Sequence, residues 1–114
     1  MELRKIRQDG ELTHVALVGR LDVPGVQSIE DTFIEQTANR GKPTLVDLSE
    51  VTFIGSTGLR MLLKTVKELH KCGAKMVLLK PQPLVEQSLI YVAFNQLMPI
   101  AYEQDRALEL LKNA

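Results

Sequence analysis

The chain has 114 residues, which is enough for one domain with a real core and too few for two. Lys plus Arg and Asp plus Glu each number 14, so the formal net charge is zero and the composition excludes a general electrostatic attraction to nucleic acid or anionic lipid. We therefore expect residues 1–114 to form a single globular domain.

An antiparallel hairpin is predicted at the start of the chain. Residues 2–8 read as a polar edge strand. Asp9 and Gly10 favour a tight turn, and the turn leads into a more apolar strand over residues 12–18. We expect residues 19–22 to end this hairpin.

A first helix is predicted next, because Asp22 is a favourable N-cap residue and Pro24 suits a first helical turn. Residues 39–43 contain the Gly and the Pro that typically end a helix. Between these signals Val26, Ile29, Phe33 and Thr37 recur at helical spacing, and Ile34 and Ala38 widen the apolar face.

A strand and a second helix are predicted in the middle of the chain. Residues 44–48 are apolar enough for an interior strand, and the helix begins after Ser56 and Thr57. Its predicted buried face consists of Leu59, Leu62, Leu63, Val66 and Leu69. Its other side carries one basic stripe, formed by Arg60, Lys64, Lys67 and Lys71. Such a stripe is ordinarily a solvated face, and the functional alternative is a surface for an acidic partner.

The rest of the chain continues the alternation of strands and helices. Gly73 ends the second helix. The later predicted elements are a strand over 75–79, a helix from Pro81 and Pro83 to about Val92, a strand over 98–102, and a helix capped by Asp105 with Ala107, Leu108 and Leu111 inward. The predicted fold class is α/β, a mixed β-sheet opened by an antiparallel hairpin and packed with α-helices.

Two hydroxyls, Ser56 and Thr57, lie between Gly55 and Gly58 at a strand-to-helix turn. In an open α/β sheet, ligands and partners ordinarily bind beyond the carboxyl ends of the strands, and a helix start favours an anion. The turn therefore predicts a phosphate carrier at Thr57 or Ser56. The structural alternative is that these residues only cap the helix, since Ser and Thr are preferred N-cap residues.

Catalysis is not expected. Residues 55–58 do not have the Gly-x-Ser-x-Gly spacing of a hydrolase elbow, and neither His14 nor His70 is placed as a base for the turn. The single Cys72 has no histidines at a zinc-ligand spacing, so the sequence predicts no metal site and no cofactor. A lone cysteine, no apolar leader and no long apolar run favour a cytoplasmic protein without membrane insertion.

Two motifs carry a family resemblance: residues 47–59 read DLSEVTFIGSTGL, and residues 19–22 read GRLD. The chain resembles the STAS domain family over nearly its whole length, in particular the bacterial anti-sigma factor antagonists. By position, the resemblance implies that Thr57, the second hydroxyl residue of the turn, accepts a phosphate, with Ser56 as the alternative. The predicted partner-binding surface comprises Asp22, Gly55, Ser56, Thr57, Gly58, Arg60 and Lys64.

The resemblance also implies a function. An unphosphorylated antagonist captures an anti-sigma factor with GHKL-type serine/threonine kinase activity and so frees a sigma factor, and phosphorylation of the turn reverses this. A PP2C-type phosphatase is a further expected partner, and nucleic acid is not. Gly55 stands where many antagonists have Asp. This departure keeps an alternative open, a non-phosphorylated STAS scaffold subunit of the lipid-transport accessory type that packs on a transporter's ATPase.

Overall fold

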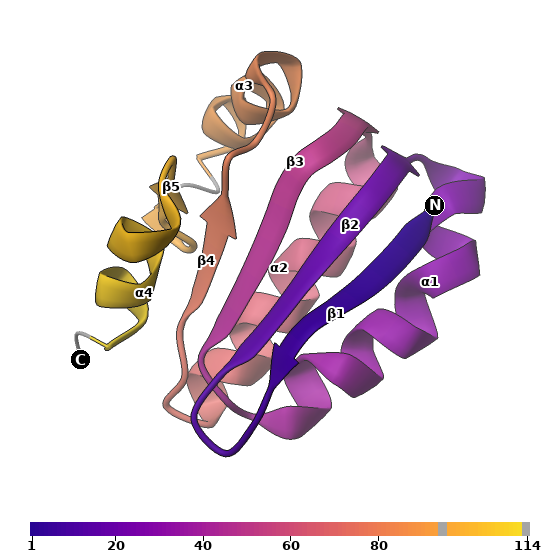
Figure 1. Cartoon of the computed structure of the whole chain (residues 1–114). Coiled ribbons are helices and arrows are strands. Elements are labelled where there is room, and N and C mark those ends of the chain that lie inside the picture. The colour runs from indigo at the N-terminus through magenta and orange to yellow at the C-terminus, as the bar shows by residue number, and fades with distance from the viewer. Residues whose placement is uncertain (94–95, 113–114) are drawn as a thin grey trace.

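The structure, a computed structural model, describes residues 1–93 and 96–112 (Figure 1). Its centre is a five-stranded sheet with the strands in chain order. The first two strands are antiparallel and every later neighbouring pair is parallel. The strands are β1 (Glu2–Gln8), β2 (Thr13–Leu21), β3 (Thr44–Ile54), β4 (Met76–Leu79) and β5 (Ile100–Ala101). The predicted fold class, an α/β mixed sheet opened by an antiparallel hairpin, is confirmed.

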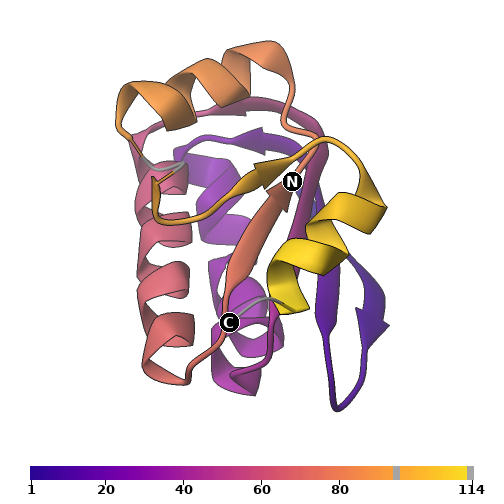
Figure 2. The ribbon, with the colours of Figure 1, turned by 90° about the vertical axis from the view of Figure 1, so that its left-hand side faces the viewer.

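Helices cover both faces of the sheet (Figure 2). Right-handed crossovers between successive parallel strands place α1 and α2 together on one face. The chain crosses to the other face only after β5, where α4 packs, and α3 lies beside the carboxyl end of β3 (Figure 1). The helical segments are α1 (Val23–Gln36), the 3₁₀ turn η1 (Ala38–Arg40), α2 (Ser56–Lys71), α3 (Pro83–Tyr91) and α4 (Gln104–Lys112).

Two apolar cores lie on opposite faces of the sheet. Because successive strand residues point to opposite faces, Leu45 and Val46 of β3 belong to different cores. The larger core is packed under α1, α2 and α3 and includes the fully buried Phe33 and Leu62. The smaller core lies under α4. The sheet is therefore a rigid platform that holds the ends of β2 and β3 in place.

The two central strands are longer than predicted. β2 runs to Leu21 rather than ending at residue 18, and β3 runs to Ile54 rather than to residue 48. The reason is that the two strands pair with each other up to Leu21 and Ile54. Each strand supplies hydrogen-bond partners for the backbone N–H and C=O groups of the other. Consequently residues 53 and 54 belong to a strand and not to the turn.

The helix predictions are confirmed with local corrections. α1 ends at Gln36, and Thr37 leads into η1. α4 begins at Gln104, where the Ala107 amide donates to the Glu103 carbonyl (3.0 Å), so Asp105 lies in the first turn and is not the cap. In α2 the buried face is rotated from the prediction, because Leu59 and Leu63 are only partly buried. The buried residues of α2 are Gly58, Met61, Leu62, Thr65, Val66 and Leu69.

The last strand is also shorter than predicted. β5 has two residues, Ile100–Ala101, instead of spanning 98–102. It pairs only with Leu78 and Leu79 at the end of β4, so little of the segment finds a ladder partner. Met98 is nevertheless fully buried and contributes to the larger core.

Candidate functional site

The turn between β3 and α2 has the geometry of an uncapped helix start. Gly55 is the N-cap residue and has extended backbone, with φ −104° and ψ −174°. Its amide donates to the Leu21 carbonyl (3.0 Å), and its carbonyl accepts from the Leu59 amide (3.0 Å). No side chain caps α2. The interpretation of Ser56 and Thr57 as N-caps is therefore wrong: they are the first two helical residues.

The two hydroxyls differ in exposure and direction. Ser56 is exposed and Thr57 is half-buried. Successive helix positions are about 100° apart, so Ser56 shares its side of α2 with Arg60, four residues on, whereas Thr57 shares its side with Lys64, seven residues on. A phosphate on Ser56 and one on Thr57 would therefore lie on opposite edges of the same basic stripe, about 100° apart around α2.

Gly58 explains how closely α2 approaches the sheet. A Cβ atom at this position would lie 2.8 Å from the Leu21 Cβ, 3.0 Å from the Ile54 Cγ1 and 3.0 Å from the Leu21 carbonyl oxygen. Real Cβ atoms essentially never approach other heavy atoms within 3.0 Å. Gly58 is thus required for packing, and through packing it sets the position of the neighbouring hydroxyls.

A second loop, at the end of β2, lies beside this turn. Because Leu21 and Ile54 are paired, Asp22 follows β2 close to where Gly55 follows β3. The Asp22 Oδ1 accepts from the Gly25 amide (2.9 Å), and its Oδ2 pairs with the Arg20 Nε (3.2 Å). The Gly25 amide foremost, together with Arg20, holds the pKa of the Asp22 carboxyl below its ordinary value. Asp22 therefore caps α1, as predicted, and remains ionised beside the turn.

Arg20 and Phe53 join the two loops. The Arg20 guanidinium carbon lies 4.5 Å from the centre of the Phe53 ring, a cation–π distance. That ring also lies against Gly55, where a Cβ would come within 3.2 Å of the Phe53 Cε2. The structure thus brings together the two sequence motifs, which are separated by some thirty positions in the chain.

The basic stripe of α2 is exposed along its length, as predicted. Lys71 forms an ion pair with Glu68 (3.1 Å) at the far end from the turn. Within the described ranges, Arg60, Lys64 and Lys67 form no ion pair. Positive charge that is not compensated inside the chain therefore begins one helical turn from Ser56.

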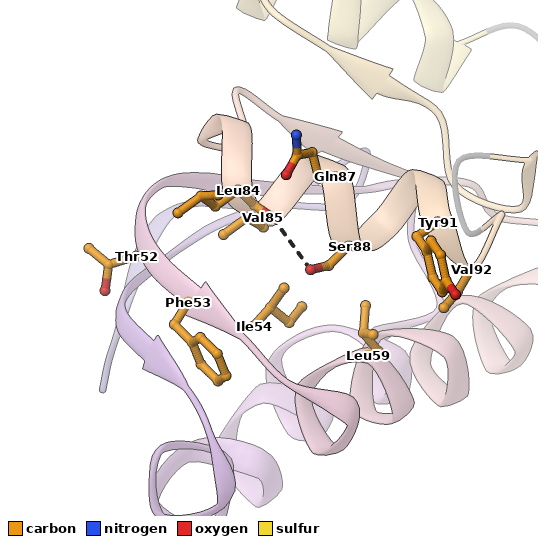
Figure 3. Close-up of a pocket in the computed structure, with 10 residues that line it drawn as sticks. All are labelled: Thr52, Phe53, Ile54, Leu59, Leu84, Val85, Gln87, Ser88, Tyr91 and Val92. Carbon is orange, nitrogen blue, oxygen red and sulfur yellow. Dashed lines mark hydrogen bonds between the residues drawn. The ribbon is translucent and has the colours of Figure 1, made fainter.

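Sequence reasoning missed a groove beside the turn. It has a volume of about 520 Å³ and lies between α3 and the end of β3 with the start of α2 (Figure 3). The segment 83–92 was correctly predicted as a helix, but not as the wall of a site. One signal was available: α3 has apolar residues on nearly every side. The groove lining includes Phe53, Ile54, Leu59, Leu84, Tyr91 and Val92.

Neither histidine lies near the turn. His14 is 4% exposed within β2, and burial foremost lowers its pKa. His70 lies at the opposite end of α2, about 20 Å from Ser56 at 1.5 Å per residue. The described residues contain no group of His, Cys, Asp and Glu side chains that could hold a metal ion. Among the helices of residues 1–93 and 96–112, none has the length and apolarity needed to span a bilayer.

Known proteins resemble this chain in sequence and in fold. The family model of the STAS domain matches residues 4–107. BtrV of Bordetella bronchiseptica, which is named as an anti-sigma factor antagonist, is 25% identical over 114 residues, covering 100% of this chain and 97% of BtrV. A Thermotoga maritima protein, also named as an anti-sigma factor antagonist, has a TM-score of 0.84 at 17% identity, covering 94% of this chain and 92% of that one.

SpoIIAA, an anti-sigma factor antagonist solved in two states, has the same fold. Its unphosphorylated form matches with a TM-score of 0.77 at 18% identity over 99% of each chain. Its phosphorylated form, from Bacillus, matches with a TM-score of 0.70 at 20% identity, covering 96% of this chain and 99% of that one.

Proposed function

Because the chain belongs to the STAS domain family, we propose that it acts as an anti-sigma factor antagonist in a partner-switching pathway. In this proposal Thr57 accepts the phosphate, with Ser56 as the alternative acceptor. The unphosphorylated protein binds an anti-sigma factor and phosphorylation releases it. The observation that carries the proposal is the uncapped start of α2, where two hydroxyls lie beside the Asp22 loop and have no capping role.

The geometry accommodates a phosphate without refolding. Phosphorylation adds about −1.5 to −2 charges at neutral pH. The first-turn amides of α2 have no side-chain cap, and the positive end of the helix dipole favours an anion at this place. The fold therefore tolerates the modification while the charge of the surface changes.

This change of charge is large enough to operate a switch. A dianion in the middle of a docking surface must be desolvated or must face partner groups, and like-charge contacts cost about several kcal/mol. Each 1.4 kcal/mol corresponds to about a tenfold change in affinity. One phosphate at Thr57 therefore suffices to separate a bound state from a released one.

The proposed partners follow from the family. The anti-sigma factor carries GHKL-type serine/threonine kinase activity and modifies the turn, and a PP2C-type phosphatase restores the binding form. The proposed partner-binding surface consists of Asp22, Gly55, Ser56, Thr57, Arg60 and Lys64. Gly58, which the sequence also predicts for this surface, is buried against Leu21 and supports the surface without forming part of it. Such a role requires binding and not catalysis by this chain, and it operates in the cytoplasm, where sigma factors act.

Mass spectrometry of the protein expressed in its own host tests the proposal. We expect phosphate on the peptide that contains residues 56 and 57 in one growth condition and not in another. Thr57→Ala abolishes the modification, and the matched control Ser56→Ala retains it. The alternative is a non-phosphorylated scaffold subunit, which Gly55 in place of Asp favours. An unmodified turn in every condition and co-purification of a transporter ATPase subunit would support that alternative.

A further inference from the structure

The groove beside α3 is mainly apolar: its described lining has no charged side chain, and its polar members are Thr52, Gln87 and Ser88. One wall is formed by Phe53 and Ile54 of β3 and Leu59 of α2. The other wall is formed by α3, where Leu84, Ser88 and Tyr91 recur at helical spacing and line the same space (Figure 3). The Ser88 hydroxyl donates to the Leu84 carbonyl (3.4 Å), so even this polar group is satisfied within α3.

The outermost apolar side chains of the α3 wall contribute little to the core of the chain. Tyr91 is 91% exposed and Leu84 is 73% exposed, whereas Val85 and Leu89 alone anchor α3 in the core. Phe53 and Val92, at 39% and 41%, extend the exposed apolar surface across the groove. A contiguous exposed apolar surface of this kind marks an interaction site, since apolar area gains free energy only when it leaves water.

Two side-chain hydrogen bonds fix α3 to the rest of the fold. The Gln82 Nε2 donates to the Ser49 carbonyl (2.9 Å), and the Tyr102 hydroxyl donates to the Glu86 carboxylate (2.5 Å). The backbone on either side of the helix is left-handed, with φ 51° at Lys80 and 59° at Ala93. Left-handed backbone at non-glycine residues is strained and persists only where the surrounding structure requires it. The wall is therefore preformed.

The charge beside the groove indicates what binds in it. Arg60 follows Leu59 about 100° further round α2 and begins the exposed basic stripe with Lys64 and Lys67, so the stripe covers the outer side of the helix whose flank forms the groove wall. None of these three side chains pairs with a carboxylate of the described residues. A ligand with acidic groups beside its apolar groups matches this arrangement. A second copy docked through the same face would bring two basic stripes into one interface without an acidic partner for either, which disfavours self-association.

We propose that the groove binds an amphipathic segment of the anti-sigma factor, with its apolar side chains between α3 and Leu59 and its acidic side chains over Arg60 and Lys64. This inference rests on the proposed function, because it names the part of the partner that the site recognises. Leu59 is three residues from Ser56 and shares its side of α2, so a segment that reaches from the groove to Arg60 crosses the start of the helix at Ser56, one residue before Thr57. In this proposal, apolar contacts in the groove provide most of the binding free energy for the anti-sigma factor. Phosphorylation of the turn then weakens binding through repulsion between the phosphate and the acidic side chains of the segment.

Binding of the purified, unphosphorylated protein to a recombinant anti-sigma factor of the same host tests this inference by calorimetry. Leu84→Gln and Tyr91→Gln each remove an exposed groove side chain while keeping a good helix former. We expect each to weaken binding by about tenfold or more, as buried aliphatic and aromatic anchors do. Ile6→Gln is the matched control, because Ile6 is 52% exposed on β1, and it should leave the Kd unchanged within about twofold.

The outcomes separate this inference from the proposed function. If the wild-type protein binds the anti-sigma factor and both groove variants bind equally well, the groove is not the docking site and the proposed function stands. If the wild-type protein binds no anti-sigma factor of its host, the proposed function fails and this inference fails with it. Arg60→Glu should also weaken binding and reduce its dependence on salt, since the pairing is ionic.

Two other occupants are tested with the same variants. Sedimentation of the wild-type protein with vesicles of phosphatidylglycerol and phosphatidylcholine tests a membrane, and light scattering after gel filtration tests a second copy. We expect the protein to stay off the vesicles and to remain monomeric. Vesicle binding or dimerisation that Tyr91→Gln abolishes would overturn the inference in favour of that occupant.

Discussion

We expect the substitution Gly58→Ala to destabilise the protein, although helix propensity alone predicts that it would be stabilising. In a helix interior, Ala is more favourable than Gly by up to about 1 kcal/mol. The structure opposes this gain, because the added Cβ would lie at 2.8 Å from the Leu21 Cβ and 3.0 Å from two further atoms of Leu21 and Ile54. The Leu21 Cβ is attached directly to the backbone of β2 and cannot rotate away. The start of α2 must therefore move from the sheet.

The magnitude follows from these two opposing effects. Overpacking a closely packed site costs about 1–3 kcal/mol, and three contacts at or below 3.0 Å place Gly58→Ala in the upper part of that range. After subtraction of the helix propensity gain, we expect a net loss of about 1–2 kcal/mol in the free energy of unfolding. For a domain of this size, each kcal/mol lowers the Tm by about 4 °C.

Urea unfolding followed by circular dichroism measures this change. Gly10→Ala is the matched control, because a Cβ at Gly10 meets no atom within 4 Å, and its effect should stay within about 0.5 kcal/mol. A Gly58→Ala protein that is as stable as the wild type, or more stable, would refute the argument that close packing against Leu21 requires glycine. The effect of Gly→Ala on the unfolded state is stabilising, so it cannot account for a loss. A Gly10→Ala protein destabilised as much as Gly58→Ala would show that the loss does not come from the contacts with Leu21.

Three further predictions concern the turn, its neighbouring loop and the buried histidine. Thr57→Glu should keep the fold and weaken anti-sigma factor binding by about tenfold or more, since it places a carboxylate at the docking surface; unchanged calorimetric affinity would contradict the switch. Asp22→Ala should lower the free energy of unfolding, because it removes the oxygen that accepts from the Gly25 amide. Asp22→Asn should keep the wild-type value, because Asn caps a helix equally well. If both variants lose the same free energy of unfolding in urea, capping is not the cause. His14 should make the fold sensitive to acid. Burial is the main cause that lowers its folded-state pKa; the Asp47 charge opposes it in part, and the Arg7 charge adds a smaller lowering effect. The unfolded state therefore binds the proton first, and stability falls as the pH drops below about 6.5. His14→Gln should flatten this part of the stability curve between about pH 7 and 5, and an unchanged slope in pH-dependent urea titrations would show that another group is responsible.

The local elements of this fold could be predicted because their determinants are close together in the chain. The periodicity of residues 59–69 predicts α2, and Asp22 with Pro24 predicts the start of α1, since caps and helical faces depend on neighbours within one or two turns. The position of Ser56 and Thr57 at a strand-to-helix turn follows from the same signals. Their exposure and their separate directions do not.

Tertiary contacts decided the rest. Residues 49–54 extend β3 because β2 pairs with them, and this pairing brings Asp22 and Arg20 beside the turn. The requirement for glycine at position 58 comes from Leu21, which is distant in the chain. The groove depends on the placement of α3 next to Leu59, which the composition of either segment does not specify. The sequence by itself thus determined which chemical groups the turn carries, whereas long-range packing determined what surrounds them, because close approach between distant segments has no local signature in the chain.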